Sequence, residues 1–223
     1  MTADFFIKRR YLLSIVICLS LFVCFLGYTA KLAYATEVWV GKTFYFLISS
    51  KSDSEAAVHT MRLDGGAGYL LTDGDHTYIA YSVYLNDDAL QAIQAGLTEE
   101  TKIVKKSVRY VSFKGKDKKK AGIYCGALNN LYNGIDVLSQ CIAKLESGGT
   151  QQACKRLLGI LERQFGYMAT VYQGQYPTFS NVCAGLQKKL QTLTEDTVFC
   201  KDLRYMLCET CEAYLRLAEH FSI

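Results

Sequence analysis

The alternation of apolar and polar residues changes along the chain and divides it into three parts. Residues 11–30 are apolar and uncharged throughout, whereas residues 43–113 contain short runs of the kind that forms β-strands. From about residue 121 onward, apolar residues recur with a helical period. The pattern predicts an apolar span, then a mixed α+β region, then an all-α region.

Two matching segments lie 33 residues apart in the mixed region, Tyr45–Ala56 and Tyr78–Ala89. Each begins as an aromatic and β-branched run and enters a short helix through an acidic residue and an Ala. A strand–helix unit that occurs twice in about 70 residues favours a ferredoxin-like or RNP-like βαββαβ domain. We expect strands at about 43–50, 68–71, 76–85 and 103–113, and helices at about 53–61 and 87–97.

Strand alternation in this domain predicts one sheet face under the helices and one open face. The face under the helices would carry Phe44, Phe46, Ile48, Ile79, Tyr81, Val83 and Leu85. On the open face, tyrosine rings could stack on sugars, and basic side chains of the last strand could attract anionic polymers. Cross-strand tyrosine packing and a solvated edge-strand charge row are the ordinary alternatives. The candidate ligand-binding residues are Tyr45, Leu47, Ser49, Tyr78, Ser82, Tyr84, Lys106 and Arg109, together with the outward Ala80.

Four apolar stripes predict four amphipathic helices in the C-terminal part, arranged as an antiparallel bundle or as two helical hairpins. We set the mixed domain at residues 36–113, a basic linker at 114–120 and the helical domain at 121–223. The stripes consist of Leu128, Leu131, Ile135, Leu138, Ile142 and Leu145; Leu158, Leu161, Phe165, Met168 and Tyr172; Phe179, Val182, Leu186, Leu190 and Leu193; and Cys200, Leu203, Leu207, Cys211, Tyr214, Ala218 and Phe221.

The apolar span at 11–30 has the length of a bilayer core when it is helical. Lys8, Arg9 and Arg10 precede it, so the positive-inside rule predicts a cytoplasmic N-terminus at 1–10 and an exported body. The sequence thus predicts a single-pass signal anchor that contacts the lipid bilayer. A cleaved signal peptide is the alternative, because Ala33–Ala35 is typical of a cleavage site.

The nine cysteines permit three interpretations. Two lie in the apolar span, and the other seven lie in the helical region, where Cys200 and Cys211 fall on an apolar stripe. We favour buried structural thiols over disulfides, and disulfides over a metal site. The Cys208–Cys211 pair has C-x-x-C spacing, so a thiol-based redox role is a weaker hypothesis.

The sequence contains no recognisable set of catalytic residues, so we predict neither an enzyme nor a cofactor or metal. The three histidines, His59, His76 and His220, lie in three different predicted elements, and no hydrolase motif frames them. The net charge of +4, with 25 basic and 21 acidic residues, is too mild to indicate nucleic acid. The predicted export also argues against RNA as a partner.

The βαββαβ layout, the internal repeat and the predicted anchor together resemble the SPOR-domain (sporulation-related repeat) proteins of the bacterial envelope. The resemblance covers about residues 43–113 and rests on FYFLISSKSDSEAA (Phe44–Ala57), GGAGYLL (Gly65–Leu71) and TYIAYSVYLNDDALQAI (Thr77–Ile93). SPOR domains have an RNP-like fold and bind peptidoglycan glycan strands stripped of stem peptides. The resemblance implies the same ligand here.

The expected function is therefore non-catalytic binding of peptidoglycan glycan by an envelope protein, in wall remodelling, cell division or sporulation. The alternative is a membrane-tethered protein-interaction scaffold in the cell envelope without glycan binding. In that alternative, the helical domain would contact an envelope protein partner.

Overall fold

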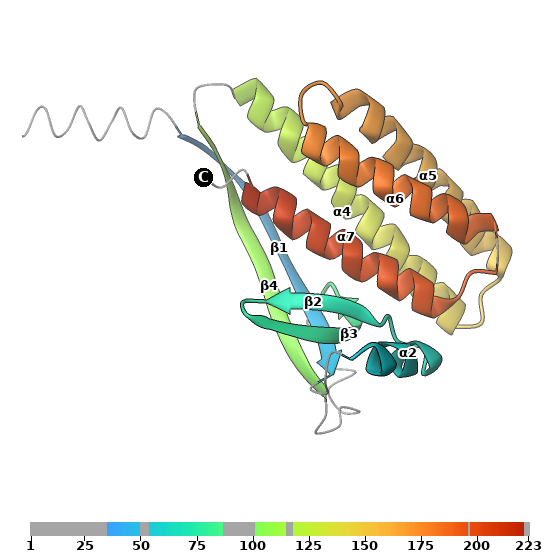
Figure 1. Ribbon diagram of the computed structural model, residues 1–223. Helices are drawn as coiled ribbons and strands as arrows, with labels where there is room; N and C mark the ends of the chain where they lie inside the picture. The colour runs from blue at the N-terminus through green and yellow to red at the C-terminus, as the bar shows by residue number, and fades with distance from the viewer. Residues whose placement is uncertain (1–34, 50–53, 87–100, 115–117, 196, 221–223) are drawn as a thin grey trace, which may run out of the picture.

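The computed structural model describes residues 35–49, 54–86, 101–114, 118–195 and 197–220 (Figure 1). Within them the chain forms an α+β fold with four strands and five helices. The strands are β1 (Ala35–Ser49), β2 (Tyr69–Asp73), β3 (His76–Tyr84) and β4 (Thr101–Lys114). The helices are α2 (Glu55–Leu63), α4 (Lys118–Glu146), α5 (Gln151–Tyr172), α6 (Pro177–Glu195) and α7 (Cys200–His220).

The four strands form one antiparallel sheet in the order β2-β3-β1-β4. β1 and β4 make a long ribbon, and the β2–β3 hairpin lies across it in Figure 1. Lys106 of β4 donates a hydrogen bond to the Thr72 carbonyl of β2 at 2.5 Å, and its Nζ lies 3.5 Å from a carboxylate oxygen of Asp73. A side chain from one edge strand thus reaches the other edge strand, so the sheet is strongly curled.

A β-bulge in β3 contributes to this bend and reverses the alternation of the strand. Leu47 pairs with Ser82, but the next residue, Ile48, pairs with Ala80, so Tyr81 has no counterpart on β1. Ala80 therefore shares a face with Ile48 and not with the residues predicted to face outward. The predicted facing is wrong for the first half of β3, because strict alternation cannot anticipate an extra residue.

The sheet face that carries Phe44, Phe46 and Ile48 packs against α4 and α7. The Phe44 ring lies 5.7 Å from the ring of Tyr214 on α7 and 6.3 Å from that of Tyr132 on α4. Strand and helix residues belong to one continuous apolar cluster. Figure 1 shows α4 and α7 beside the sheet and α5 and α6 farther from it. The sheet and the inner helices therefore share a core.

The helices begin and end where local chemistry favours it. The Ser54 hydroxyl caps α2 by accepting from the Ala57 amide at 3.3 Å, and the Thr150 hydroxyl caps α5 in the same way at 3.4 Å. Gly148, with φ +81°, provides the left-handed turn between α4 and α5. The four stripes of the C-terminal part are confirmed as helices.

The predicted membrane anchor is contradicted. Among the residues that the structure describes, no helix is both long enough and apolar enough to cross a membrane. These helices have a polar face instead, as α5 has with Arg156 and Arg163, because they lie between a core and solvent. The fold class with an anchor helix, the single-pass topology and the cell-membrane localisation are corrected accordingly. The segments 1–10 and 11–30, and with them the expected bilayer contact, lie outside the described residues.

The predicted fold class, a mixed α+β domain followed by a separate C-terminal helical bundle, is also wrong. α2 lies between β1 and β2, as expected for the helix at about 53–61, so the helices are not all C-terminal. The inner helices α4 and α7 cover the sheet and do not form an independent bundle. The second expected helix of the mixed region, at 87–97, lies outside the described residues.

Candidate functional site

The sheet-face residues predicted to bind a ligand do not form one open surface. Tyr45 and Leu47 are each only 8% exposed, and Ser49 and Ser82 are also buried. Tyr78 is half-buried against the core cluster. Because of the bulge, it lies on the same sheet face as Ile48 and not on the predicted open face. The predicted stacking surface is therefore not available to an extended ligand in this conformation.

The remaining three predicted residues are dispersed. Tyr84 is half-buried, and its burial raises the pKa of its phenol, an effect that nearby Arg204 opposes. Lys106 is engaged by Thr72 and Asp73 at the sheet edge, whereas Arg109 is exposed on β4. The Lys105 ammonium lies 5.4 Å from the centre of the Tyr45 ring. A basic side chain of β4 thus packs on an aromatic ring of the neighbouring strand β1.

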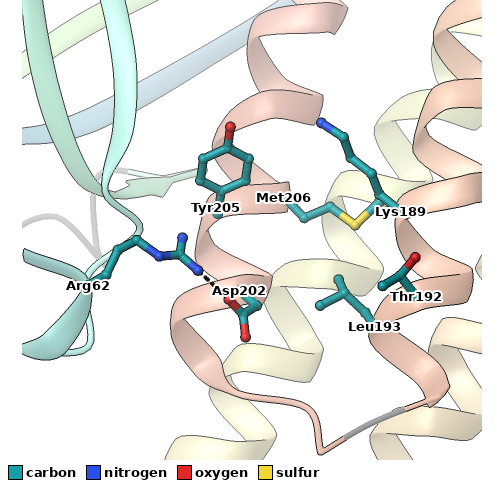
Figure 2. A pocket seen from close by; sticks show the side chains of 7 residues that line it. All are labelled: Arg62, Lys189, Thr192, Leu193, Asp202, Tyr205 and Met206. Carbon is teal, nitrogen blue, oxygen red and sulfur yellow. Dashed lines mark hydrogen bonds and ion pairs between the residues drawn. The ribbon is translucent and has the colours of Figure 1, made fainter. Parts of the chain in front are cut away.

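A groove lies between α2, β2, α6 and α7, where side chains from all four elements converge. We call it the Tyr205 groove, because two adjacent cavities share Tyr205 and Arg62 in their linings. The first cavity has a volume of about 350 Å³, and Figure 2 shows its side chains converging from α2 and from α6 and α7. It is lined by Arg62, Lys189, Thr192, Leu193, Asp202, Tyr205 and Met206.

Arg62 forms one wall of the groove and ties α2 to α7. Its guanidinium lies 2.5 Å from the Asp202 carboxylate, a contact drawn as a dashed line in Figure 2. It also donates to the Ala67 carbonyl at 2.9 Å, and it lies 5.6 Å from the centre of the Tyr205 ring. Arg62 therefore contacts three partners and links α2 to α7 at the wall of the first cavity.

Lys189 approaches the same aromatic ring from α6. Its ammonium lies 5.8 Å from the Tyr205 ring centre and 2.5 Å from Oε1 of Glu209 on α7. In Figure 2 Arg62 and Lys189 lie on opposite sides of Tyr205. The ring is flanked by two cations of the protein itself, which leaves little of its surface for stacking on a sugar.

The second cavity lies on the β2 side of Tyr205 and has a volume of about 560 Å³. Tyr69 and Tyr205 meet edge to face there, with ring centres 5.2 Å apart. The Tyr69 hydroxyl donates to the Glu212 carboxylate, and burial together with that carboxylate raises the pKa of Tyr69 strongly. Val58 and the half-exposed Leu70 give this cavity an apolar wall.

Glu209 has one oxygen without a partner. Its Oε1 pairs with Lys189, but Oε2 is buried and no donor in the described part of the chain reaches it. Glu209 also lines the second cavity. A buried carboxylate oxygen that lacks a hydrogen bond is costly, and this oxygen is enclosed by protein and is not open to the cavity.

None of the seven cysteines of the helical part lines the two cavities of this groove. All seven in the helical part are free, and all but the half-buried Cys200 are buried. Burial raises the pKa of Cys183 to about 12 and also raises that of Cys211, so neither is a ready nucleophile. The prediction of buried thiols is confirmed for six of the seven cysteines and not for Cys200. Within the described residues no group of three or more His, Cys, Asp or Glu side chains is placed to hold a metal ion.

Sequence analysis did not find the Tyr205 groove, because its lining comes from four elements that are far apart in the chain. Arg62 and Asp202 are separated by 140 positions. Leu193 was assigned to a buried stripe, and Met206 lies off the stripe expected for its helix. Only the closely spaced charges of α7 gave a local signal, and helix-surface charges are usually solvated.

Comparison of the chain with protein-family models, curated proteins and solved structures finds no match. The resemblance to SPOR domains therefore stays a prediction.

Proposed function

We propose that this protein is a non-catalytic interaction module whose Tyr205 groove binds an extended segment of a partner polypeptide. The observation that supports this most is the pair of adjoining cavities that share Arg62 and Tyr205 in their linings. Peptide-binding grooves combine apolar pockets for side chains with a few fixed polar groups. Leu193 and Met206 supply the apolar part here, and the two ion pairs supply the fixed polar part.

Glycan binding on the sheet face has less support than the interaction function. It would need Tyr45 and Leu47 to be accessible, and both are buried. It would also need Tyr78 to share their face, which the bulge prevents. A polypeptide with apolar side chains matches the chemistry of the Tyr205 groove better than a polyhydroxylated chain does.

A selection of random peptides on the full chain tests this function. The matched variant is Thr192→Trp, since Thr192 is an exposed position of α6 that lines the first cavity, and an indole there would fill it. Thr178→Trp, on an exposed position of α6 outside the lining, is the control. We expect peptides with a bulky apolar residue to bind the wild type and the control but not Thr192→Trp. Peptides that bind all three alike, or no enrichment, would contradict the proposal.

A further inference from the structure

The outward face of α5 carries a second line of apolar side chains, in addition to the stripe that packs in the core. Ile160, Tyr167 and Val171 are between 49% and 69% exposed. Their spacing of seven and four residues places them on one side of the helix, over a length of about 17 Å. Leu161 and Phe165 of the buried stripe face the core instead. A contiguous exposed apolar line of this kind is typical of an interaction surface.

Two arginines accompany this apolar line. Arg156 and Arg163 are exposed on the same side of α5. Among the ion pairs formed within the described part of the chain, none includes either guanidinium group. Glu162, the one carboxylate of α5, is half-buried and lies about 100° around the helix from Arg163. The exposed side of α5 is therefore both apolar and basic.

The neighbouring helices leave this positive charge in place. Gly134 of α4 lies against a side chain of α5, so the exposed Asp136, two residues later, points about 200° away around α4. On the other side, Gly166 of α5 lies against the amide of Gln187 on α6. The next residue of α6, Lys188, is exposed. The charge that α6 adds here is therefore also positive.

We propose that the outward face of α5 binds an acidic amphipathic helix of a partner protein. The apolar side chains of that helix would pack along Ile160, Tyr167 and Val171, as in a two-stranded coiled coil. Its carboxylates would lie beside Arg156 and Arg163. Tyrosine and arginine are also among the residues that most often carry the binding energy of an interface. This surface is separate from the groove described above, because no residue of α5 lines either of its cavities.

A second copy of the chain fits this face less well than an acidic partner does. In an antiparallel pair about a twofold axis, Ile160 of each copy would pack on Tyr167 of the other, and the two Arg163 side chains would meet near the axis. In a parallel pair, each arginine would lie opposite its own counterpart. Both arrangements bring like charges together, which disfavours them. An acidic helix pairs with the same guanidinium groups.

Three synthetic peptides of about 18 residues test this preference. They share one apolar stripe and a side-chain crosslink that keeps them helical as monomers, and they carry Glu, Gln or Lys at the flanking positions. Fluorescence anisotropy with the full chain measures their affinities. We expect the Glu peptide to bind about fivefold more tightly than the Gln peptide, and the Lys peptide to bind most weakly. High salt should remove the difference.

Two variants locate the site on α5. Tyr167→Ser is expected to weaken the binding of the Glu and Gln peptides on the order of tenfold, because it removes the most exposed ring of the apolar line. The double variant Arg156→Gln/Arg163→Gln should bring the Glu peptide to the affinity of the Gln peptide. The control Lys102→Gln/Arg109→Gln makes the same charge change at exposed positions of β4 and should keep the preference of the wild type.

The outcomes separate this inference from the proposed function. Equal affinities for the Glu and Gln peptides, no binding of either, or a preference that survives in the double arginine variant would overturn the inference. Self-association of the chain that Tyr167→Ser abolishes would also overturn it, because a second copy would then occupy the face. Thr192→Trp should bind the peptides as the wild type does. Loss of peptide binding in Thr192→Trp would place the peptide in the Tyr205 groove, and so contradict this inference while supporting the proposed function.

Discussion

Helices α5 and α7 have similar apolar stripes in the sequence but very different surroundings. α7 contacts the sheet, α4 and α6, and even its Thr210 is completely buried, with the hydroxyl donating to the Met206 carbonyl at 2.7 Å. α5 lies on the outside of the fold and leaves Ile160, Tyr167 and Val171 exposed, Tyr167 at 69%. An apolar stripe thus indicates that a helix has one buried face. It does not indicate whether other elements of the fold also cover the opposite face.

The largest expected difference between these helices is in the cost of removing an apolar side chain. Leu207→Ala on α7 should lower the free energy of unfolding by about 2–5 kcal/mol, because Leu207 is buried on a helix that is enclosed on most sides. Ile160→Ala on α5 should cost less than about 1 kcal/mol, since more than half of Ile160 is exposed. Urea unfolding of both variants measures the difference, and equal costs would break the comparison.

The contact between α2 and α7 depends on Gly68. Gly68 has φ +61°, and an added Cβ would lie 2.6 Å from Cγ of Arg62, whose guanidinium binds α7. Gly74 has nearly the same φ, +60°, but its Cβ would meet nothing. Gly74→Ala should cost about 1 kcal/mol from backbone strain alone, and Gly68→Ala about 2–3 kcal/mol. A Gly68→Ala variant as stable as Gly74→Ala would show that Arg62 moves aside freely.

Two buried tyrosines give a smaller and more selective test of the inner layer. The Tyr124 hydroxyl donates to the Leu217 carbonyl of α7 at 2.8 Å, whereas no partner in the described residues reaches the Tyr214 hydroxyl. Tyr124→Phe should therefore cost about 1 kcal/mol, and Tyr214→Phe should be neutral or stabilising by up to about 1 kcal/mol. Thermal unfolding of the two variants provides the comparison. A clear loss of stability in Tyr214→Phe would reveal a partner for that hydroxyl.

The smallest effect is expected on the outer face of α5. Tyr167→Ser replaces an exposed ring and should change the free energy of unfolding by no more than about 0.5 kcal/mol. Urea unfolding at two protein concentrations measures it. A larger loss, or one that depends on concentration, would mean that the α5 face is covered in solution.

The sequence predicts individual elements well and their assembly poorly. The Ser54–Leu63 region, the Asp73–Gly74 turn and the four C-terminal helices follow from local chemistry, such as capping residues, turn residues and apolar spacing. β1 was expected to begin at about residue 43 but begins at Ala35, because its first part is stabilised by pairing with β4. β4 is distant in sequence, so its pairing with β1 cannot be predicted from the apolar and polar residues that precede residue 43.

The candidate site shows the same limit. Tyr45 and Ser82 were selected because alternation placed them on a face that was expected to be open, and both are buried. Glu209 has no local feature that separates it from other acidic residues of a helix surface. Its unpartnered oxygen arises only from the way in which α6, α7 and β2 meet. Side chains that function through long-range packing are outside the reach of periodicity arguments.

The hydrogen bond from Lys106 to Thr72 also affects how another strand could add to the edge of the sheet. Edge strands with free backbone groups can recruit strands from other molecules and so start aggregation. Here the Thr72 carbonyl of edge strand β2 is already engaged by a charged side chain from the other edge strand, β4. A strand of a second molecule that added to the sheet at this point would have to displace Lys106 from the Thr72 carbonyl. It would also have to lie next to the lysine's ammonium group. The curl of the sheet thus places a charged obstacle to strand addition at this one point of the β2 edge.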